Sequence, residues 1–184
     1  MAVSTHSGHR TRRRVTLIVI LAVAALLVVG IGGAVTVGQV THVMYVPSAA
    51  MEPTFPTGSR VIVVRTPDDG PKAADVIIHT KPEDPATSFI KRVVAVGPAT
   101  VAFADGRVLV NGQPLDEPYL PSGSQTRGAP ADLGTPCPPA EPCTVGEGEL
   151  YVLGDNRENS QDSRYDGPVR RDAVEGVVSR KLFG

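Results

Sequence analysis

The sequence predicts a mostly β domain that follows a single membrane-spanning helix near the N-terminus. Residues 15–40 contain no ionisable side chain. After residue 41, apolar residues come in short runs rich in Val and Ile, separated by Pro, Gly, Asp and Asn, and this pattern is typical of strands joined by turns. No stretch in this part has the apolar period of a long amphipathic helix. We therefore expect a closed or partly closed, barrel-like β-sheet over residues 41–184.

The 184-residue chain has room for one domain with a hydrophobic core. Its net charge of −1 conceals an asymmetry, because residues 1–40 hold four arginines and no acidic residue, whereas the remainder holds 14 basic and 19 acidic side chains. An acidic balance on the main domain argues against a nucleic-acid surface. We expect no nucleic-acid partner.

The uncharged run over residues 15–40 is the predicted transmembrane helix, since roughly 20 helical residues span the hydrocarbon core of a bilayer. A cleaved secretory signal peptide is the alternative, but its apolar region would be only about 7–15 residues long. Residues 38–42 also lack a convincing cleavage site. By the positive-inside rule, the arginine-rich residues 1–14 should be cytoplasmic and residues 41–184 should lie outside the cell membrane. Membrane lipid is then an expected partner of this single-pass chain.

The outer domain divides into predicted strands and loops. Turn signals at Ala104-Asp105-Gly106 and Asn111-Gly112 separate neighbouring apolar runs. Loops are expected over residues 66–72, 81–86 and 114–145, where Pro, Gly and polar residues gather. The predicted strands are residues 61–64, 76–78, 88–96, 100–103, 108–110, 149–153 and 173–182.

Both cysteines, Cys137 and Cys143, lie in the proline-rich segment 114–145. Outside the membrane a disulfide is permitted, and we expect these two residues to form a small staple. Two free thiols or half of a metal site are the alternatives. No His or Cys lies close enough in the sequence to complete a metal site, so no metal is expected.

Residues 46–55 carry small side chains between Pro47 and Pro53. Proline fixes φ and removes a backbone donor, which predicts a rigid, extended turn here and not a helix or a central strand. Small side chains would let another chain approach this backbone closely. The alternative is a plain linker between the anchor and the domain.

Lys91 is the most informative charged residue of the longest predicted strand. By alternation it shares one face with Phe89 and Val93, whereas Arg92 lies on the opposite face. On a core-facing side the lysine is desolvated, which favours its neutral form and allows it to act as a general base. The alternative is a strand lysine that extends to solvent. Further along, residues 154–164 form a polar segment whose Asn, Asp and Ser side chains could simply cap their own backbone.

Together these three segments resemble the conserved boxes of bacterial type I signal peptidases. Residues 47–54 match Pro-Ser-x-Ser-Met-x-Pro-Thr at every fixed position except the nucleophile, where this chain has Ala50 before Met51. Residues 89–94 match the box that contains the catalytic lysine, and residues 154–164 match Gly-Asp-Asn-x-x-x-Ser-x-Asp-Ser-Arg in full. Further matches are Val110-Asn111-Gly112 and residues 117–120.

The resemblance implies a role for each matched residue. Lys91 is the general base, and Ser160 hydrogen-bonds its ammonium group. The hydroxyl of Ser48 helps to form the oxyanion hole with the backbone N–H at position 50. Met51 supports the site, and Asp162 and Arg164 form a supporting ion pair.

The implied activity is endoproteolytic removal of signal peptides from exported preproteins by a Ser/Lys dyad, without metal or cofactor. A substrate segment would bind as an added strand, with small side chains one and three residues before the scissile bond. We expect the chain to act as a monomer.

Ala50 predicts that the chain is inactive, because a methyl group has no lone pair with which to attack a carbonyl. An engineered serine-to-alanine form and a natural pseudoenzyme that binds preproteins are the two explanations, and Ser48 as a replacement nucleophile is a third possibility. Two smaller departures, Ala74-Asp75 and Pro98-Ala99 where Gly-Asp pairs are usual, could alter local turns.

Overall fold

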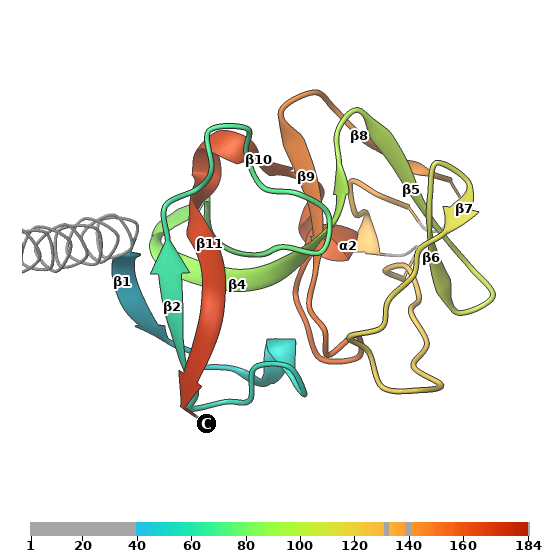
Figure 1. Cartoon of the computed structure of the whole chain (residues 1–184). Helices are drawn as coiled ribbons and strands as arrows, with labels where there is room; N and C mark the ends of the chain where they lie inside the picture. Colours follow the sequence, from blue (N-terminus) through green and yellow to red (C-terminus); the bar gives the residue numbers. More distant parts are fainter. Residues whose placement is uncertain (1–39, 131–132, 139–140, 184) are drawn as a thin grey trace, which may run out of the picture. The chain divides into compact units, whose positions relative to one another are not determined.

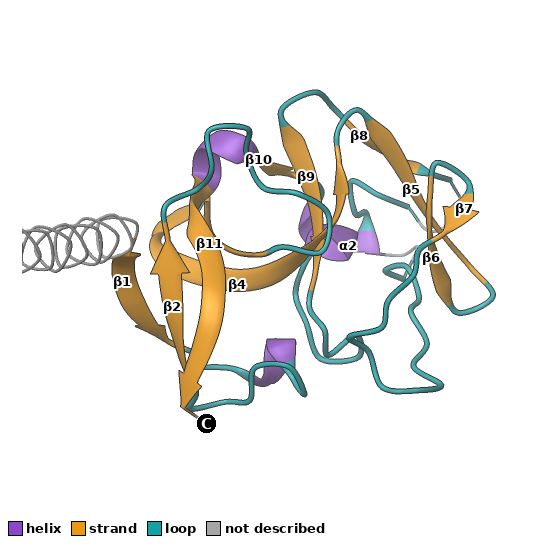
Figure 2. Cartoon of the chain, viewed as in Figure 1, coloured by secondary structure: helices purple, strands orange, loops and turns teal. Residues whose placement is uncertain are grey.

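Two β-sheets make up the part of the chain described by the computed structural model (Figures 1 and 2). One sheet has seven strands in the order β1-β2-β11-β3-β4-β9-β10, and the other has four in the order β7-β6-β5-β8. The first consists of β1 (Val40–Tyr45), β2 (Arg60–Val64), β11 (Val174–Phe183), β3 (Val76–Lys81), β4 (Asp84–Val96), β9 (Glu149–Leu153) and β10 (Val169–Arg170). The second consists of β7 (Gln113–Pro114), β6 (Arg107–Val110), β5 (Ala99–Ala104) and β8 (Cys143–Val145).

The structure describes residues 40–130, 133–138 and 141–183. Helical segments in these ranges are short: η1 (Ala49–Met51), α2 (Ser163–Asp166) and η3 (Arg171–Ala173). None of the described helices is long and apolar enough to cross a membrane. The predicted cytoplasmic tail and all but the last residue of the predicted spanning segment, residues 15–40, lie outside the described residues.

The mostly β prediction for the outer domain is confirmed, and each predicted strand is present, β9 with the predicted ends and the others with different ends. The loop predicted over residues 81–86 is wrong, because β3 and β4 form a hairpin there and Lys81 pairs with Asp84. Charged residues and prolines gave this segment a loop composition, but an exposed hairpin tip tolerates both. Strands β1, β7, β8 and β10 were not predicted. Strand β8 has three residues, too few to show a pattern, and forms by pairing with β5.

Strand β4 is central to the core because it contributes side chains to three separate apolar clusters. Ile90 packs in a cluster with Met51 and Phe55, Val93 packs with residues of β3 and β9, and Val94 packs in the cluster that contains both cysteines. Both faces of β4 are therefore buried. Figure 1 shows this strand running from the large sheet toward the four-stranded sheet, which the chain enters at β5. Any charged side chain on this part of β4 has to be desolvated.

The turn before β3 keeps a glycine-like backbone although alanine occupies it. Ala74 has φ 73°, a conformation that glycine adopts readily and alanine does not. Its N–H donates to the carbonyl of Val93, and its own carbonyl accepts from the Arg92 guanidinium at 2.9 Å. The departure from Gly-Asp at residues 74–75 has therefore left these turn contacts in place. At the other departure, Pro98 follows a cis peptide bond and β5 begins at Ala99.

Candidate active site

The segment that carries Ala50 is a tight turn and not the extended one that we predicted. Residues Ala49–Met51 form a single 3-10 turn, with hydrogen bonds from Glu52 N–H to Ala49 O and from Phe55 N–H to Met51 O. The two prolines flank this turn without entering it, so they do not restrict φ at its three residues. Ala50 is 7% exposed and Met51 is fully buried.

The polar segment after β9 holds this turn through its backbone carbonyls. The Asn156 backbone N–H donates to the carbonyl of Ala50 at 3.1 Å, and the Asn156 side-chain amide donates to the carbonyl of Ala49 at 3.1 Å. Gly154 lies against the same place, because a Cβ there would be 2.5 Å from Ala50 O and 2.2 Å from Ser160 Oγ. Glycine is therefore required at this position. The Ala50 carbonyl and the Ser160 hydroxyl therefore both lie beside Gly154.

A buried ion pair between Arg92 and Asp155 ties together the three segments singled out from the sequence. The guanidinium donates to both carboxylate oxygens, at 2.8 and 2.6 Å, and the Thr54 hydroxyl donates to the same carboxylate at 2.6 Å. The Arg92 guanidinium also lies 3.9 Å from the centre of the Tyr119 ring. We had assigned no role to Arg92 or Asp155. The sequence did contain a signal for this pair. Arg92 shares its face of the strand with Ile90 and Val94, and an arginine buried between apolar residues requires an acidic partner.

The segment after β7 covers this ion pair through a second buried one. Arg157 pairs with Glu117, and Glu117 accepts from the Tyr119 hydroxyl at 2.7 Å. Arg157 also donates to the Thr126 hydroxyl and to the carbonyl of Gly154. Residues 117–126 are thus anchored on the polar segment beside the turn. We did not predict this contact, although residues 117–120 were among the segments that matched the family.

Lys91 is buried, as its predicted face required. Lys91 is 4% exposed, and its Nζ donates to the carbonyl of Ile90 at 3.1 Å. Burial lowers the pKa of Lys91, and the positive charge of Lys81 acts in the same direction, whereas the carboxylate of Asp162 opposes them. A lysine with a lowered pKa supplies a larger fraction of neutral amine, which is the form that can accept a proton.

The structure shows no hydrogen bond between Ser160 and Lys91, the contact that the resemblance implies. The Ser160 hydroxyl oxygen is buried and has no hydrogen-bond partner among the described residues. Ser48 lies at the start of the turn with extended backbone angles, is exposed, and makes no capping hydrogen bond with its side chain. The 3-10 turn also removes the alternation that would have placed the side chains of residues 48 and 50 on one face.

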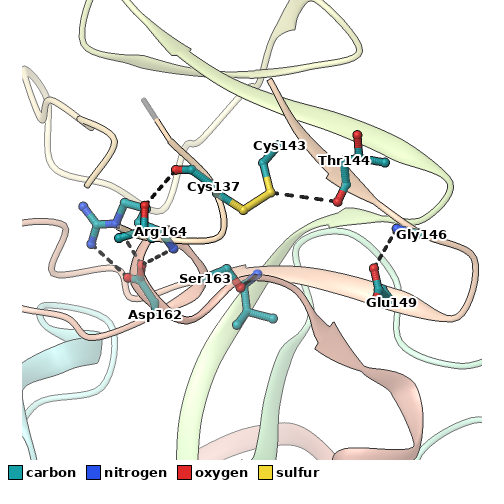
Figure 3. Close-up of a disulfide and its surroundings, with 10 residues drawn as sticks. Cys137, Cys143, Thr144, Gly146, Glu149, Asp162, Ser163 and Arg164 are labelled. Atoms are coloured by element: carbon teal, nitrogen blue, oxygen red, sulfur yellow. Dashed lines mark hydrogen bonds and ion pairs between the residues drawn. A yellow bond between two sulfur atoms is a disulfide. The ribbon is translucent and has the colours of Figure 1, made fainter. Parts of the chain in front are cut away.

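Asp162 and Arg164 form the ion pair that the resemblance implies (Figure 3). The guanidinium donates to the two carboxylate oxygens at 2.8 and 2.9 Å. The same carboxylate accepts from the Gly154 N–H at 3.0 Å and from the Arg164 N–H at the start of α2. This pair fixes the shape of the polar segment next to the turn.

The disulfide between Cys137 and Cys143 is present, as predicted, and Figure 3 shows it close to the Asp162–Arg164 pair. Both cysteines are buried in an apolar cluster with Val101 and Tyr151. The bond therefore joins the proline-rich segment to the core of the four-stranded sheet. In the described ranges, no three His, Cys, Asp or Glu side chains lie together as ligands for a metal ion.

The described residues include a buried lysine on β4 and a tight turn whose carbonyls are held by the polar segment after β9. The chain belongs to the family "Signal peptidase, peptidase S26", whose model matches residues 13–183. This family consists of serine endopeptidases, and the resemblance found from the sequence is confirmed at the level of the family.

Two relatives agree with this assignment at the level of sequence. The chain is 35% identical over 146 residues to signal peptidase I of Leptolyngbya laminosa, a match that covers 74% of the chain and 66% of that protein. It is 33% identical over 143 residues to signal peptidase IB of Staphylococcus aureus, covering 73% of each. Among solved structures, signal peptidase I from Enterococcus faecalis shares 30% identity and covers 59% of the chain and 97% of that structure, with a TM-score of 0.48.

Proposed function

We propose that this chain binds the signal peptides of exported preproteins at the outer face of the cell membrane. Its site is that of a serine–lysine signal peptidase with alanine at the nucleophile position, so the chain itself does not cleave. A substrate segment would lie extended beside the turn, with its small side chains against Ala50 and the neighbouring apolar residues. Residues 1–40 would anchor the chain in the membrane.

The observation that carries this proposal is the pair of hydrogen bonds from Asn156 to the carbonyls of Ala49 and Ala50. These bonds fix the backbone at position 50 without using any side chain there. A serine hydroxyl introduced at this position would therefore inherit a positioned backbone. The Ser160 hydroxyl lies beside Gly154, next to the Ala50 carbonyl, and Lys91 supplies a buried amine on β4.

The decisive experiment replaces Ala50 by serine in the full chain. Preprotein cleavage is measured for four forms: the chain itself, Ala50→Ser, Lys91→Ala, and the double variant. We expect activity only in Ala50→Ser, and its loss by a factor of about 10³ or more when Lys91 is also replaced, because the two residues act as a unit. The cleavage rate should rise with pH, since only the neutral amine accepts the proton.

Two outcomes would contradict the inference that the nucleophile at position 50 is the single missing part of a serine–lysine site. Silence of the Ala50→Ser form would show that the site lacks more than a nucleophile, which favours the pseudoenzyme explanation over an engineered substitution. Cleavage by the unaltered chain that stops in Ser48→Ala would make Ser48 the nucleophile.

Binding can be measured separately from cleavage, because the proposed pockets do not require a hydroxyl at position 50. We expect the unaltered chain to bind a signal peptide with Ala one and three residues before the cleavage position. A matched peptide with Leu at these two places should bind at least about tenfold more weakly, since a large side chain would clash with a closed pocket. Fluorescence anisotropy of labelled peptides is a suitable measurement. Equal affinities for the two peptides would rule out the small-residue pockets.

A further inference from the structure

His79, on β3, has a buried ring nitrogen without a partner. Its Nδ1 lies 3.0 Å from the carbonyl of Thr80. A carbonyl only accepts, so Nδ1 carries the proton and Nε2 of the neutral ring is left as an acceptor. His79 is 3% exposed, and its Nε2 has no hydrogen-bond partner among the described residues. A buried acceptor of this kind is unusual, and a ligand that donates a hydrogen bond would satisfy it.

The surroundings of His79 favour the uncharged ring. Burial has the largest effect on the pKa of His79 and lowers it, although the hydrogen bond to Thr80 acts in the opposite direction. The imidazole stacks on the Phe89 ring with centroids 5.7 Å apart, so its orientation is also restricted by packing. Nε2 is therefore an acceptor in a defined position.

A cavity of about 430 Å³ is lined in part by His79. This volume lies in the range of small-molecule sites and is far larger than the roughly 30 Å³ that one water occupies. The β3–β4 hairpin, β9 and the segment around α2 form its wall. The apolar residues of the wall are Pro82, Pro85, Val152, Pro168, Val169 and Ala173. An apolar group of several carbons can thus fit beside the imidazole.

The same wall carries more negative than positive charge. Its cations are Lys81 and Arg170, and its acids are Glu83, Glu149, Asp162, Asp166 and Asp172. Lys81 already pairs with Asp166, and Arg170 already pairs with Asp172. Asp162 is compensated by Arg164. Two negative charges, those of Glu83 and Glu149, are therefore in excess.

Glu149 is the better placed of these two acids, because it is half-buried whereas Glu83 is exposed. Its Oε2 accepts from the Gly146 N–H at 2.8 Å (Figure 3). Arg170 lies opposite it in the pairing of β9 with β10, but that guanidinium is bound to another carboxylate. An anionic ligand would find no unpaired cation in this wall, whereas a cationic ligand would be attracted.

We propose that this cavity binds a primary ammonium group carried on an apolar chain, with one N–H donating to His79 Nε2. Such a ligand matches the buried acceptor, the excess negative charge and the apolar lining together. A free alkylamine and the N-terminus of a peptide with apolar first residues both have this chemistry. The inference goes beyond signal-peptide binding, since it uses neither the turn at Ala50 nor Lys91.

The ligand class is tested on the unaltered full chain in zwitterionic detergent and phosphate buffer. The Nε2 resonance of His79 is followed by ¹⁵N NMR at constant pH while butylammonium, butanol or butanoate is added. We expect a saturable shift with butylammonium, at least about tenfold weaker binding of butanol, and no response to butanoate. Equal responses to the three would overturn the proposal. So would the absence of any response to butylammonium, which would leave a cavity that holds only water.

The assigned residues are tested by calorimetric titration of variants with butylammonium. His79→Phe keeps the aromatic ring and removes the acceptor, and should weaken binding about tenfold or more. Glu149→Gln removes one charge at constant size and should weaken it about two- to fivefold. Glu147→Gln is the matched control, because Glu147 is exposed and lies outside the cavity wall. Parent-like affinity in His79→Phe, with folding verified by thermal unfolding, would overturn the assignment of His79.

The two sources of the ammonium group are separated by competition. The dipeptide amide Ala-Val-NH₂ and its N-acetylated form are each added to the complex with butylammonium. Displacement by the free form alone would identify a peptide N-terminus as the ligand, and displacement by neither would identify a free alkylamine. Equal displacement by both forms would show that no ammonium group is required, and would overturn the proposal.

Discussion

Lys91 and Arg92 are neighbours in β4, and both are almost fully buried, but their charges have different surroundings. Arg92 donates to both oxygens of the Asp155 carboxylate. Lys91 donates to a single backbone carbonyl. A buried charge without a paired opposite charge is costly, so the charge of Lys91 opposes folding, whereas that of Arg92 is compensated. The difference is expected of a site in which one cation is structural and the other exchanges its proton.

Replacing Lys91 by Met should therefore stabilise the domain. A lysine whose pKa is lowered in the folded state binds fewer protons there than in the unfolded chain. Above the unfolded-state pKa of 10.5 the lysine is neutral in both states and does not reduce the free energy of unfolding. As pH falls from there through the lowered folded-state pKa, the free energy of unfolding decreases. At neutral pH, we expect the free energy of unfolding of Lys91→Met to exceed that of the parent by about 1–3 kcal/mol.

Urea unfolding between pH 7 and pH 10 measures this effect. The parent should gain stability with rising pH, and the gain should be smaller in Lys91→Met. Lys181→Met, at an exposed position of β11, is the control and should retain the parent's dependence. A destabilised Lys91→Met protein would show that the lysine is held by contacts more favourable than its burial suggests.

Among the elements, the turn at residues 72–75 shows how a strand pairing can maintain an unfavourable backbone. Ala74 stays at positive φ because its N–H and carbonyl are both bonded, to Val93 and Arg92. The Asp75 carboxylate also accepts a hydrogen bond from the Lys72 N–H at 2.8 Å. These contacts outweigh the local strain of an L-residue in this region.

Ala74→Gly should relieve that strain. We expect the free energy of unfolding to increase by about 1 kcal/mol, since glycine adopts positive φ without a steric penalty. The adjacent Ala73→Gly is a matched control, because Ala73 is exposed and is not among the residues with positive φ. That change should lower stability slightly by adding freedom to the unfolded chain. Equal effects of the two substitutions, measured by thermal unfolding, would refute the strain argument.

For the whole molecule, the division of charge remains the basis for predicting its orientation. The first 14 residues contain four arginines, whereas residues 41–184 have an excess of acidic side chains. Exposed arginines on the outer domain do not alter the prediction, because long loops and whole domains are translocated largely regardless of their charge.

Replacing Arg10, Arg12, Arg13 and Arg14 by Gln should weaken the orientation of the chain. In intact spheroplasts, added protease should degrade residues 41–184 of the parent, and a fraction of the variant molecules should become protected. The matched control replaces four exposed arginines of the outer domain, Arg60, Arg65, Arg107 and Arg180, and should behave like the parent. Protection of the parent's domain from external protease would contradict the predicted topology.

Local pattern alone predicted the longer strands that follow β1, the turn at residues 104–106 and the face of β4 on which Lys91 lies. Each of these depends on alternation or on residues next to one another in sequence. Motif order alone likewise identified the family. The disulfide followed from two cysteines and the expected compartment.

Other features depended on contacts between distant segments. The 3-10 turn at Ala49–Met51 is held by Asn156, which is 106 residues beyond Ala50 in the chain. The partner of Arg92 is Asp155, in the segment after β9, and the residue opposite Lys91 in β3 is Ile77. Register depends on the packing of whole sheets, because a shift of one residue would turn every side chain of a strand to the other face. For that reason the sequence pattern could place Lys91 on one face of its strand but could not reveal which residues lie across the sheet from it.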